Sequence, residues 1–172
     1  YYIPTSKKII LGVASNWYQK GFGDFIRLSH LVDENYVIVL VGLNDKELSN
    51  LPKNIIGIKR TESQAELRSL YSSSDVYFNP TWVDNFPTTN IEALACGTPI
   101  VVYDTGGCAE AVSPTTGYVV RQGNIKEAHE RIKEICEHSK IQYIEECRSQ
   151  VLNKYNSEQQ YKEYYDLYTS IL

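Results

Sequence analysis

Short apolar runs alternate along this chain with segments of helical periodicity, and this alternation limits its fold more than any other feature. The longest runs are almost continuously apolar, which is typical of strands buried on both faces of a parallel sheet. The expected strands lie at 8–14, 36–41, 55–58, 76–78, 99–103 and 117–120. Alternating strands and helices imply right-handed crossovers with helices on both sheet faces. The sequence therefore predicts an α/β fold with a parallel sheet flanked by helices.

Helical patterns fill the gaps between these strands. Apolar residues recur at helical spacing from Phe22 to Leu31, and Ser63 with Glu66 forms a capping-box signal for another helix. A helical tail is predicted from Ile125 to Leu172. Near its end one apolar-aromatic face is expected, formed by Tyr161, Tyr164, Tyr165, Tyr168, Ile171 and Leu172. This face either packs on the chain's own sheet or contacts another domain.

Length and composition exclude several classes of protein. The 172 residues suit one domain, and the net charge of -4 argues against a nucleic-acid partner. No apolar run approaches the roughly 20 residues that span a bilayer, and no signal peptide precedes the first strand. We therefore expect a cytoplasmic protein without a membrane span. Because the sequence has no Met and starts at Tyr1, we also expect a fragment whose missing part precedes Tyr1.

Cysteines and histidines give no sign of a metal site. The four cysteines form no C-x-x-C pair and have no histidine at metal-ligand spacing, so we expect reduced packing or loop residues. A disulfide or zinc role is the alternative. The three histidines fall on helical patterns and form no credible triad.

Two carboxylates, Asp84 and Glu92, bracket a turn that leads into a predicted helix. Pro87 is tolerated at a helix start, so the first free amides belong to about Thr88, Thr89 and Asn90 and favour phosphate or another anion. Glu92 lies about one turn further in, and a ribose diol would supply two donors to it. The alternative is that Asp84 is a turn residue and Glu92 a solvated helix position.

The surrounding segment resembles the signature of the retaining glycosyltransferases of family 4, also called group 1 glycosyltransferases. That signature is a Glu-x7-Glu spacing followed by a run like EAxAxGxPVVxxxxGGxxE. The matching letters are Asp84, Phe86, the run from Glu92 to Val102, Gly106-Gly107 and Glu110. The resemblance implies a Rossmann-like C-terminal half of a GT-B fold. Residues 1–172 would then be a single donor-nucleotide-binding domain that lacks an N-terminal acceptor domain.

The resemblance also implies roles for residues around the signature. Glu92 would hold the nucleotide ribose. Asp84, where the family usually has Glu, would lie near the donor sugar together with Gly106 and Gly107. The two glycines would let the backbone approach the donor closely.

A second loop, Ser15–Gly21, resembles the family's phosphate-binding loop. Lys20 matches the lysine that holds the nucleotide diphosphate, whereas Ser15 stands where the family usually has an Arg. The resemblance places the nucleobase at Arg60 and Thr61, with a surface turn as the alternative.

By resemblance the intact enzyme transfers a hexose-type sugar from a UDP- or GDP-sugar to a glycan or lipid-linked acceptor with retention of configuration. No metal ion or other cofactor is expected, and Lys20 and Asp84 are the candidate catalytic residues. The isolated domain is expected to be inactive, and the full-length enzyme could lie peripherally at the inner membrane face. Two alternatives remain open: a nucleotide-sugar-binding module without transferase activity, and a GT-B-fold nucleotide-sugar epimerase.

Overall fold

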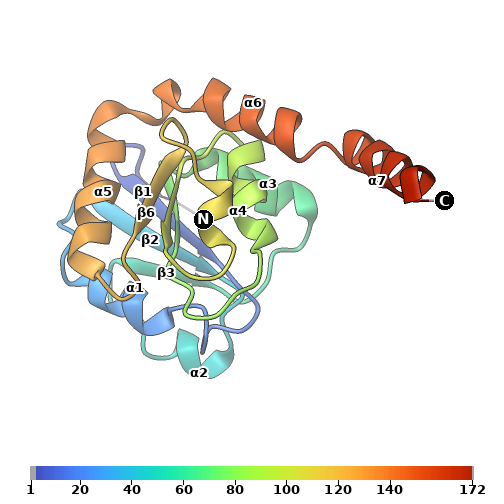
Figure 1. The fold of residues 1–172 in the computed structure, drawn as a ribbon. Helices are drawn as coiled ribbons and strands as arrows, with labels where there is room; N and C mark the ends of the chain where they lie inside the picture. Colours follow the sequence, from blue (N-terminus) through green and yellow to red (C-terminus); the bar gives the residue numbers. More distant parts are fainter. Residues whose placement is uncertain (1–2, 172) are drawn as a thin grey trace.

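One parallel sheet forms the centre of the molecule, as a computed structural model of residues 3–171 shows (Figure 1). Its six strands have the order β3-β2-β1-β4-β5-β6, and every neighbouring pair is parallel. The strands are β1 (Lys8–Val13), β2 (Tyr36–Val41), β3 (Ile55–Ile58), β4 (Val76–Asn79), β5 (Ile100–Tyr103) and β6 (Gly117–Val120). The predicted Rossmann-like sheet is confirmed, with strand boundaries that differ from the expected ones by at most one residue.

Helices cover both faces of this sheet. They are α1 (Phe22–Ser29), α2 (Asp45–Leu48), α3 (Gln64–Ser73), α4 (Thr88–Ala95), α5 (Ile125–His138), α6 (Ile144–Lys154) and α7 (Ser157–Ile171), with short 3₁₀ helices η1 (Cys108–Ala111) and η2 (Lys140–Gln142). Successive strand residues point to opposite faces, so Ile10 packs with α1 and α5 while Leu11 packs with α3, α4 and α6. Both layers are apolar, and each contains buried cysteine: Cys136 in the first, Cys108 and Cys147 in the second.

Helix α2 was not predicted from the sequence. Its N-terminus is closed by a reciprocal capping box, in which the Asn44 side chain accepts from the Glu47 amide at 2.9 Å and the Glu47 carboxylate accepts from the Asn44 amide at 2.8 Å. The pattern Asn-x-x-Glu was the available signal, but a helix of four residues has no periodicity to support it.

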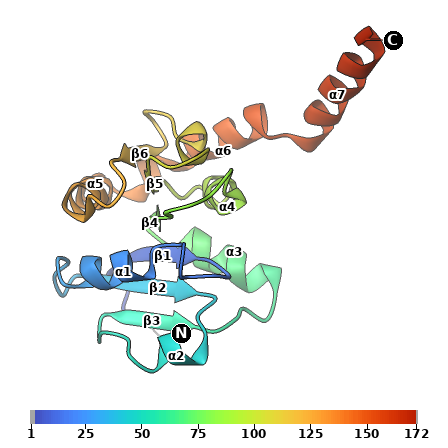
Figure 2. The same ribbon diagram turned by 60° about the horizontal axis from the view of Figure 1, so that its bottom comes forward.

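Helix α7 extends away from the rest of the chain (Figure 2). The expected aromatic face is present, with Tyr161, Tyr164, Tyr165 and Tyr168 between 58% and 75% exposed. The alternative in which this face packs on the chain's own sheet is therefore wrong. Leu172, expected on the same face, lies outside the described residues. Within residues 3–171, no helix is both long and apolar enough to cross a bilayer.

A buried carboxylate joins α1 to two other segments of the fold. Asp24 is only 3% exposed, and it accepts from the Trp82 indole N–H at 2.7 Å and from the Tyr103 hydroxyl at 2.9 Å. The Arg27 guanidinium completes its set of partners. Burial and the adjacent Asp24 charge raise the pKa of the Tyr103 hydroxyl, which therefore stays a neutral donor. Asp24 thus ties α1 to β5 and to the loop after β4.

Replacing Asp24 is expected to destabilise the fold. Asp24→Ala leaves the buried Tyr103 hydroxyl and the Trp82 indole N–H without an acceptor, and we expect the free energy of unfolding to fall by about 3 kcal/mol. Urea denaturation measures this change. Asp45→Ala is the control, because the Asp45–Lys59 ion pair is exposed and its loss should cost less than about 1 kcal/mol. Equal stabilities of the two variants would contradict the role given to Asp24.

Candidate functional site

The order of the strands reverses direction between β1 and β4, and in parallel sheets ligands bind at such a point, beyond the carboxyl ends of the strands. A pocket of about 210 Å³ lies there. Its lining comes from the loops after β1 and β4 and from the start of α4: Val13, Ala14, Ser15, Lys20, Asn79, Asp84, Phe86, Pro87, Thr88 and Thr89. Five of the predicted site residues thus share one pocket.

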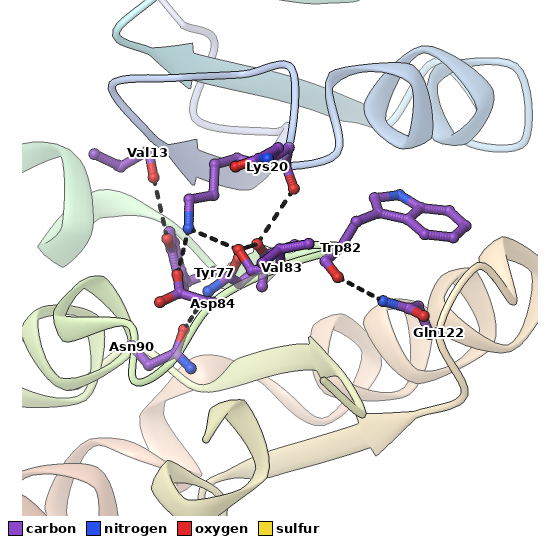
Figure 3. A network of polar contacts seen from close by, with 11 residues as sticks. Val13, Lys20, Tyr77, Trp82, Val83, Asp84, Asn90 and Gln122 are labelled. Carbon is purple, nitrogen blue, oxygen red and sulfur yellow. Dashed lines mark hydrogen bonds and ion pairs between the residues drawn. The ribbon is translucent and has the colours of Figure 1, made fainter. Parts of the chain in front are cut away.

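An ion pair crosses this pocket. The Lys20 ammonium lies 2.5 Å from the Asp84 carboxylate and also donates to the Val83 carbonyl at 3.2 Å (Figure 3). The side chains of Lys20 and Asp84 are 29% and 19% exposed, so water still reaches both. The cation expected to hold phosphate and the acid expected near the sugar are therefore adjacent, and in this state they neutralise each other.

Backbone contacts hold the two loops together. The Trp82 amide donates to the Gln19 carbonyl at 2.9 Å, and the Thr81 hydroxyl donates to the same carbonyl at 3.3 Å. Gly21 has φ +80°, and a Cβ atom there would lie 2.3 Å from the Pro80 carbonyl oxygen. Glycine next to Lys20 is thus required by the close approach of the two loops.

The N-terminus of α4 supplies the second electropositive group at the pocket. Pro87 precedes the helix, no side-chain hydrogen bond caps the first turn of α4, and Thr88 and Thr89 both line the pocket. The helix start is anchored to β4, because the buried side-chain amide of Asn79 donates to the side-chain oxygen of buried Asn90 at 2.8 Å. The Asn90 amide, also expected to be free, instead donates to the Pro87 carbonyl at 3.1 Å. Binding of an anion by the amides of Thr88 and Thr89 stays a prediction.

Glu92 does not line this pocket. It lies one turn further along α4, in a second hollow of about 650 Å³ between α3 and α4. The lining residues are Gln64, Ala65, Leu67, Arg68, Tyr71, Glu92, Ala95 and Cys96. The Glu92 carboxylate accepts from the Tyr71 hydroxyl at 3.0 Å. No local sequence pattern marks Tyr71 as the partner of a residue 21 positions away.

The predicted glycine loop follows β5 and packs against the Asp84 loop. Gly106 has φ +50°, and a Cβ atom there would lie 1.8 Å from the Asp84 carbonyl oxygen. The Gly107 amide donates to the Asn85 carbonyl at 2.7 Å. A Cβ atom at Gly107 would lie 2.4 Å from the same Asn85 oxygen, so the chain's own backbone requires both glycines beside Asp84.

Arg60 and Thr61, the predicted nucleobase residues, lie in the loop after β3. This loop is at the same edge of the sheet as the pocket, but two strands away from β1, and neither residue lines either hollow. Arg60 is exposed and Thr61 half-buried. Among residues 3–171, no three His, Cys, Asp or Glu side chains are grouped so that they could hold a metal ion.

Comparison with known families finds one match over most of the chain. Residues 2–156 match the family described as "Glycosyl transferases group 1". A Campylobacter jejuni protein, N,N'-diacetylbacillosaminyl-diphospho-undecaprenol alpha-1,3-N-acetylgalactosaminyltransferase, is 28% identical over 78% of this chain and 37% of its own length. An uncharacterized glycosyltransferase of Haemophilus influenzae is 30% identical over 70% of this chain and 37% of its own length. The chain thus spans little more than a third of either relative.

Solved structures share the fold. Sucrose-phosphate synthase from Thermosynechococcus elongatus superposes with a TM-score of 0.82 and 22% identity, over 98% of this chain and 47% of that protein. A glycosyltransferase from Rickettsia africae superposes with a TM-score of 0.83 and 19% identity, over 98% of this chain and 48% of that protein. In both cases the shared fold covers about half of the larger protein.

The close packing of the glycine loop can be tested by substitution. Gly106→Ala places a methyl group against the Asp84 carbonyl at a positive φ, and we expect it to lower the free energy of unfolding by about 2 kcal/mol. Gly23→Ala is the matched control, because a Cβ atom at Gly23 meets nothing within 4 Å and alanine favours the helix. Urea denaturation compares the two. A Gly106→Ala chain as stable as the Gly23→Ala chain would contradict this account.

Proposed function

The chain belongs to the glycosyl transferases group 1 family, and from this premise we propose that it is the donor-nucleotide-binding domain of a retaining, family 4 glycosyltransferase with GT-B architecture. The observation that carries the proposal is the grouping of Lys20, Asp84 and the α4 N-terminus around one pocket at the strand-order reversal. A cation and a free helix N-terminus together form a site for an anion. The anion proposed here is the diphosphate of a UDP- or GDP-sugar.

The diphosphate would displace the ion pair that closes the pocket. Because Lys20 and Asp84 are both partly exposed, their attraction is screened by water and amounts to about 1 kcal/mol or less. A diphosphate offers Lys20 a larger charge, and the amides of Thr88 and Thr89 at the same pocket add donors. Ser15, where the family usually has Arg, would contribute only a hydroxyl. Most of the positive charge that the protein presents to the diphosphate would then come from Lys20.

Asp84 and Glu92 would have different tasks along the donor. Asp84, released from Lys20, would accept hydrogen bonds from the hydroxyls of a hexose, beside the Gly106–Gly107 loop. Glu92 would accept from the ribose diol in the hollow between α3 and α4. The base would lie toward the loop of Arg60 and Thr61. In this arrangement the donor runs from the α3–α4 hollow to the pocket at the strand-order reversal.

The chemistry follows from these positions. When the sugar leaves, negative charge develops on the nucleoside diphosphate, and Lys20 with the α4 N-terminus would stabilise it without a metal ion. The acceptor groups would come from an N-terminal domain, and we expect the isolated chain to be inactive in transfer. Its span of 37% of the Campylobacter relative supports this division, and the name of that relative supports a lipid-linked acceptor. We place the protein in the cytoplasm, with the longer enzyme peripheral to the membrane.

Removal of Glu92 tests the ribose assignment. A thermal-shift screen of UDP, GDP and ADP identifies the nucleotide, since a ligand specific for the native state raises the melting temperature. We expect Glu92→Ala to abolish calorimetric binding of that nucleotide, because the ribose loses its acceptor. Glu163→Ala on the exposed helix α7 should leave binding unchanged. Unchanged affinity of the Glu92→Ala chain would remove the ribose assignment.

Removal of Lys20 tests the phosphate assignment. We expect Lys20→Ala to weaken binding of the nucleoside diphosphate about tenfold or more, because a charged hydrogen bond is lost. Binding of the corresponding nucleoside, which has no phosphate, should change little. Lys133→Ala serves as the control, since Lys133 pairs with Glu137 on the surface of α5. Equal losses for nucleotide and nucleoside would show that Lys20 does not act on the phosphates.

A further inference from the structure

Tyr71 is a core residue, and it lines the hollow between α3 and α4 together with Glu92. It is 1% exposed, it lies on α3, and its hydroxyl donates across to the Glu92 carboxylate on α4 at 3.0 Å. A buried tyrosine hydroxyl needs a partner, and Glu92 is the partner that the described part of the chain provides. The contact therefore joins the core to an exposed carboxylate.

Several contacts fix the position of Tyr71. Its ring meets the Tyr77 ring edge to face, with centroids 5.6 Å apart. Its backbone carbonyl accepts from the Thr98 hydroxyl at 2.6 Å and from the Lys140 ammonium at 3.3 Å. Because the ring and the backbone are both held, the hydroxyl has little freedom to move away from Glu92.

The hydroxyl is also a permanent donor. Burial, together with the nearby negative charge of Glu92, raises the pKa of Tyr71 far above its ordinary value. The phenol thus remains neutral at physiological pH and donates a hydrogen bond to the carboxylate. A carboxylate has about four lone-pair sites, and one donor from Tyr71 leaves the others free. Oxygen Oε1 and the rest of Oε2 remain available for two further donors.

The carboxylate itself lies on an exposed part of α4, and an unrestrained Glu side chain there would lose rotamer freedom on binding a ligand. A side chain that is already held in place loses less conformational entropy when the ligand binds, so the ligand binds more tightly. We propose that Tyr71 is a positioning residue, whose hydroxyl holds Glu92 in the orientation that accepts both hydroxyls of a ribose diol. This inference rests on the proposed role of Glu92 and names the residue through which its position is set.

The test compares ribonucleotides with their 2'-deoxy counterparts. Calorimetry with UDP and dUDP, and with GDP and dGDP, measures how strongly the chain prefers the diol. We expect Tyr71→Phe to weaken binding of the ribonucleotide about fivefold and to change binding of the deoxynucleotide much less, since one hydroxyl needs less exact placement. The ribo-to-deoxy affinity ratio should therefore fall. If the role of Tyr71 were purely structural, Tyr71→Phe would weaken the binding of both nucleotides equally and leave the affinity ratio unchanged.

A second Tyr–Glu pair provides the matched control. The Tyr118 hydroxyl donates to Glu134 at 2.7 Å, on β6 and α5, away from the site, so Tyr118→Phe should leave both affinities unchanged. Melting temperatures of the variants show whether the fold is retained. An unchanged ratio, an equal loss for both nucleotides, or a Tyr71→Phe chain that unfolds would each overturn the proposal. Failure of the unsubstituted chain to bind any of the four nucleotides would instead contradict the proposed function, and the positioning role with it.

Discussion

The geometry of the site depends on the hydrogen bonds that the buried Asp24 carboxylate accepts. A carboxylate that leaves water needs compensating donors, and Asp24 obtains them from Arg27, from Trp82 in the loop after β4, and from Tyr103 on β5. The sheet alone places the ends of β1 and β4 side by side, but it does not fix the loops beyond them. Because Trp82 is held by Asp24, the following residues Val83 and Asp84 come within reach of Lys20.

This anchoring brings opposite charges together in the pocket. Lys20 and Asp84 cancel, and Ser15 adds no charge where the family usually has an Arg, so the α4 N-terminus is the positive group that stays unopposed. In the proposed function, a diphosphate would interact with that terminus and compete with Asp84 for Lys20. Pairing of Lys20 with the phosphate would release Asp84 from its ion pair. The two proposed roles are thus linked, since neither residue is available while the pair is closed.

Local patterns account for the parts of the fold that the sequence predicted. The strands are marked by continuous apolar runs, the start of α4 by Pro87, and the tight loops by glycines, and each of these signals lies within a few residues of the feature that it marks. The contacts that the sequence did not reveal join distant positions: Asp24 meets Tyr103 across 79 positions, and Tyr71 meets Glu92 across 21. These pairs depend on how helices pack on the sheet, which side-chain type alone does not specify. For the same reason, the sequence left open where the aromatic face of α7 lies.

The C-terminal helices are part of the support of the site. Burial lowers the pKa of Lys140 to about 8, so at neutral pH its ammonium still donates to the carbonyls of Tyr71 and Ser72 and to the Thr98 hydroxyl. These bonds hold the last turn of α3, which carries Tyr71. The end of α6 acts in the same way on the signature segment, since the Tyr155 hydroxyl donates to the Glu110 carbonyl at 3.1 Å. Helices that carry no signature residue therefore determine where signature residues lie. Substitutions at Lys140 and Tyr155 should therefore alter the positions of α3 and η1 as well as lowering stability.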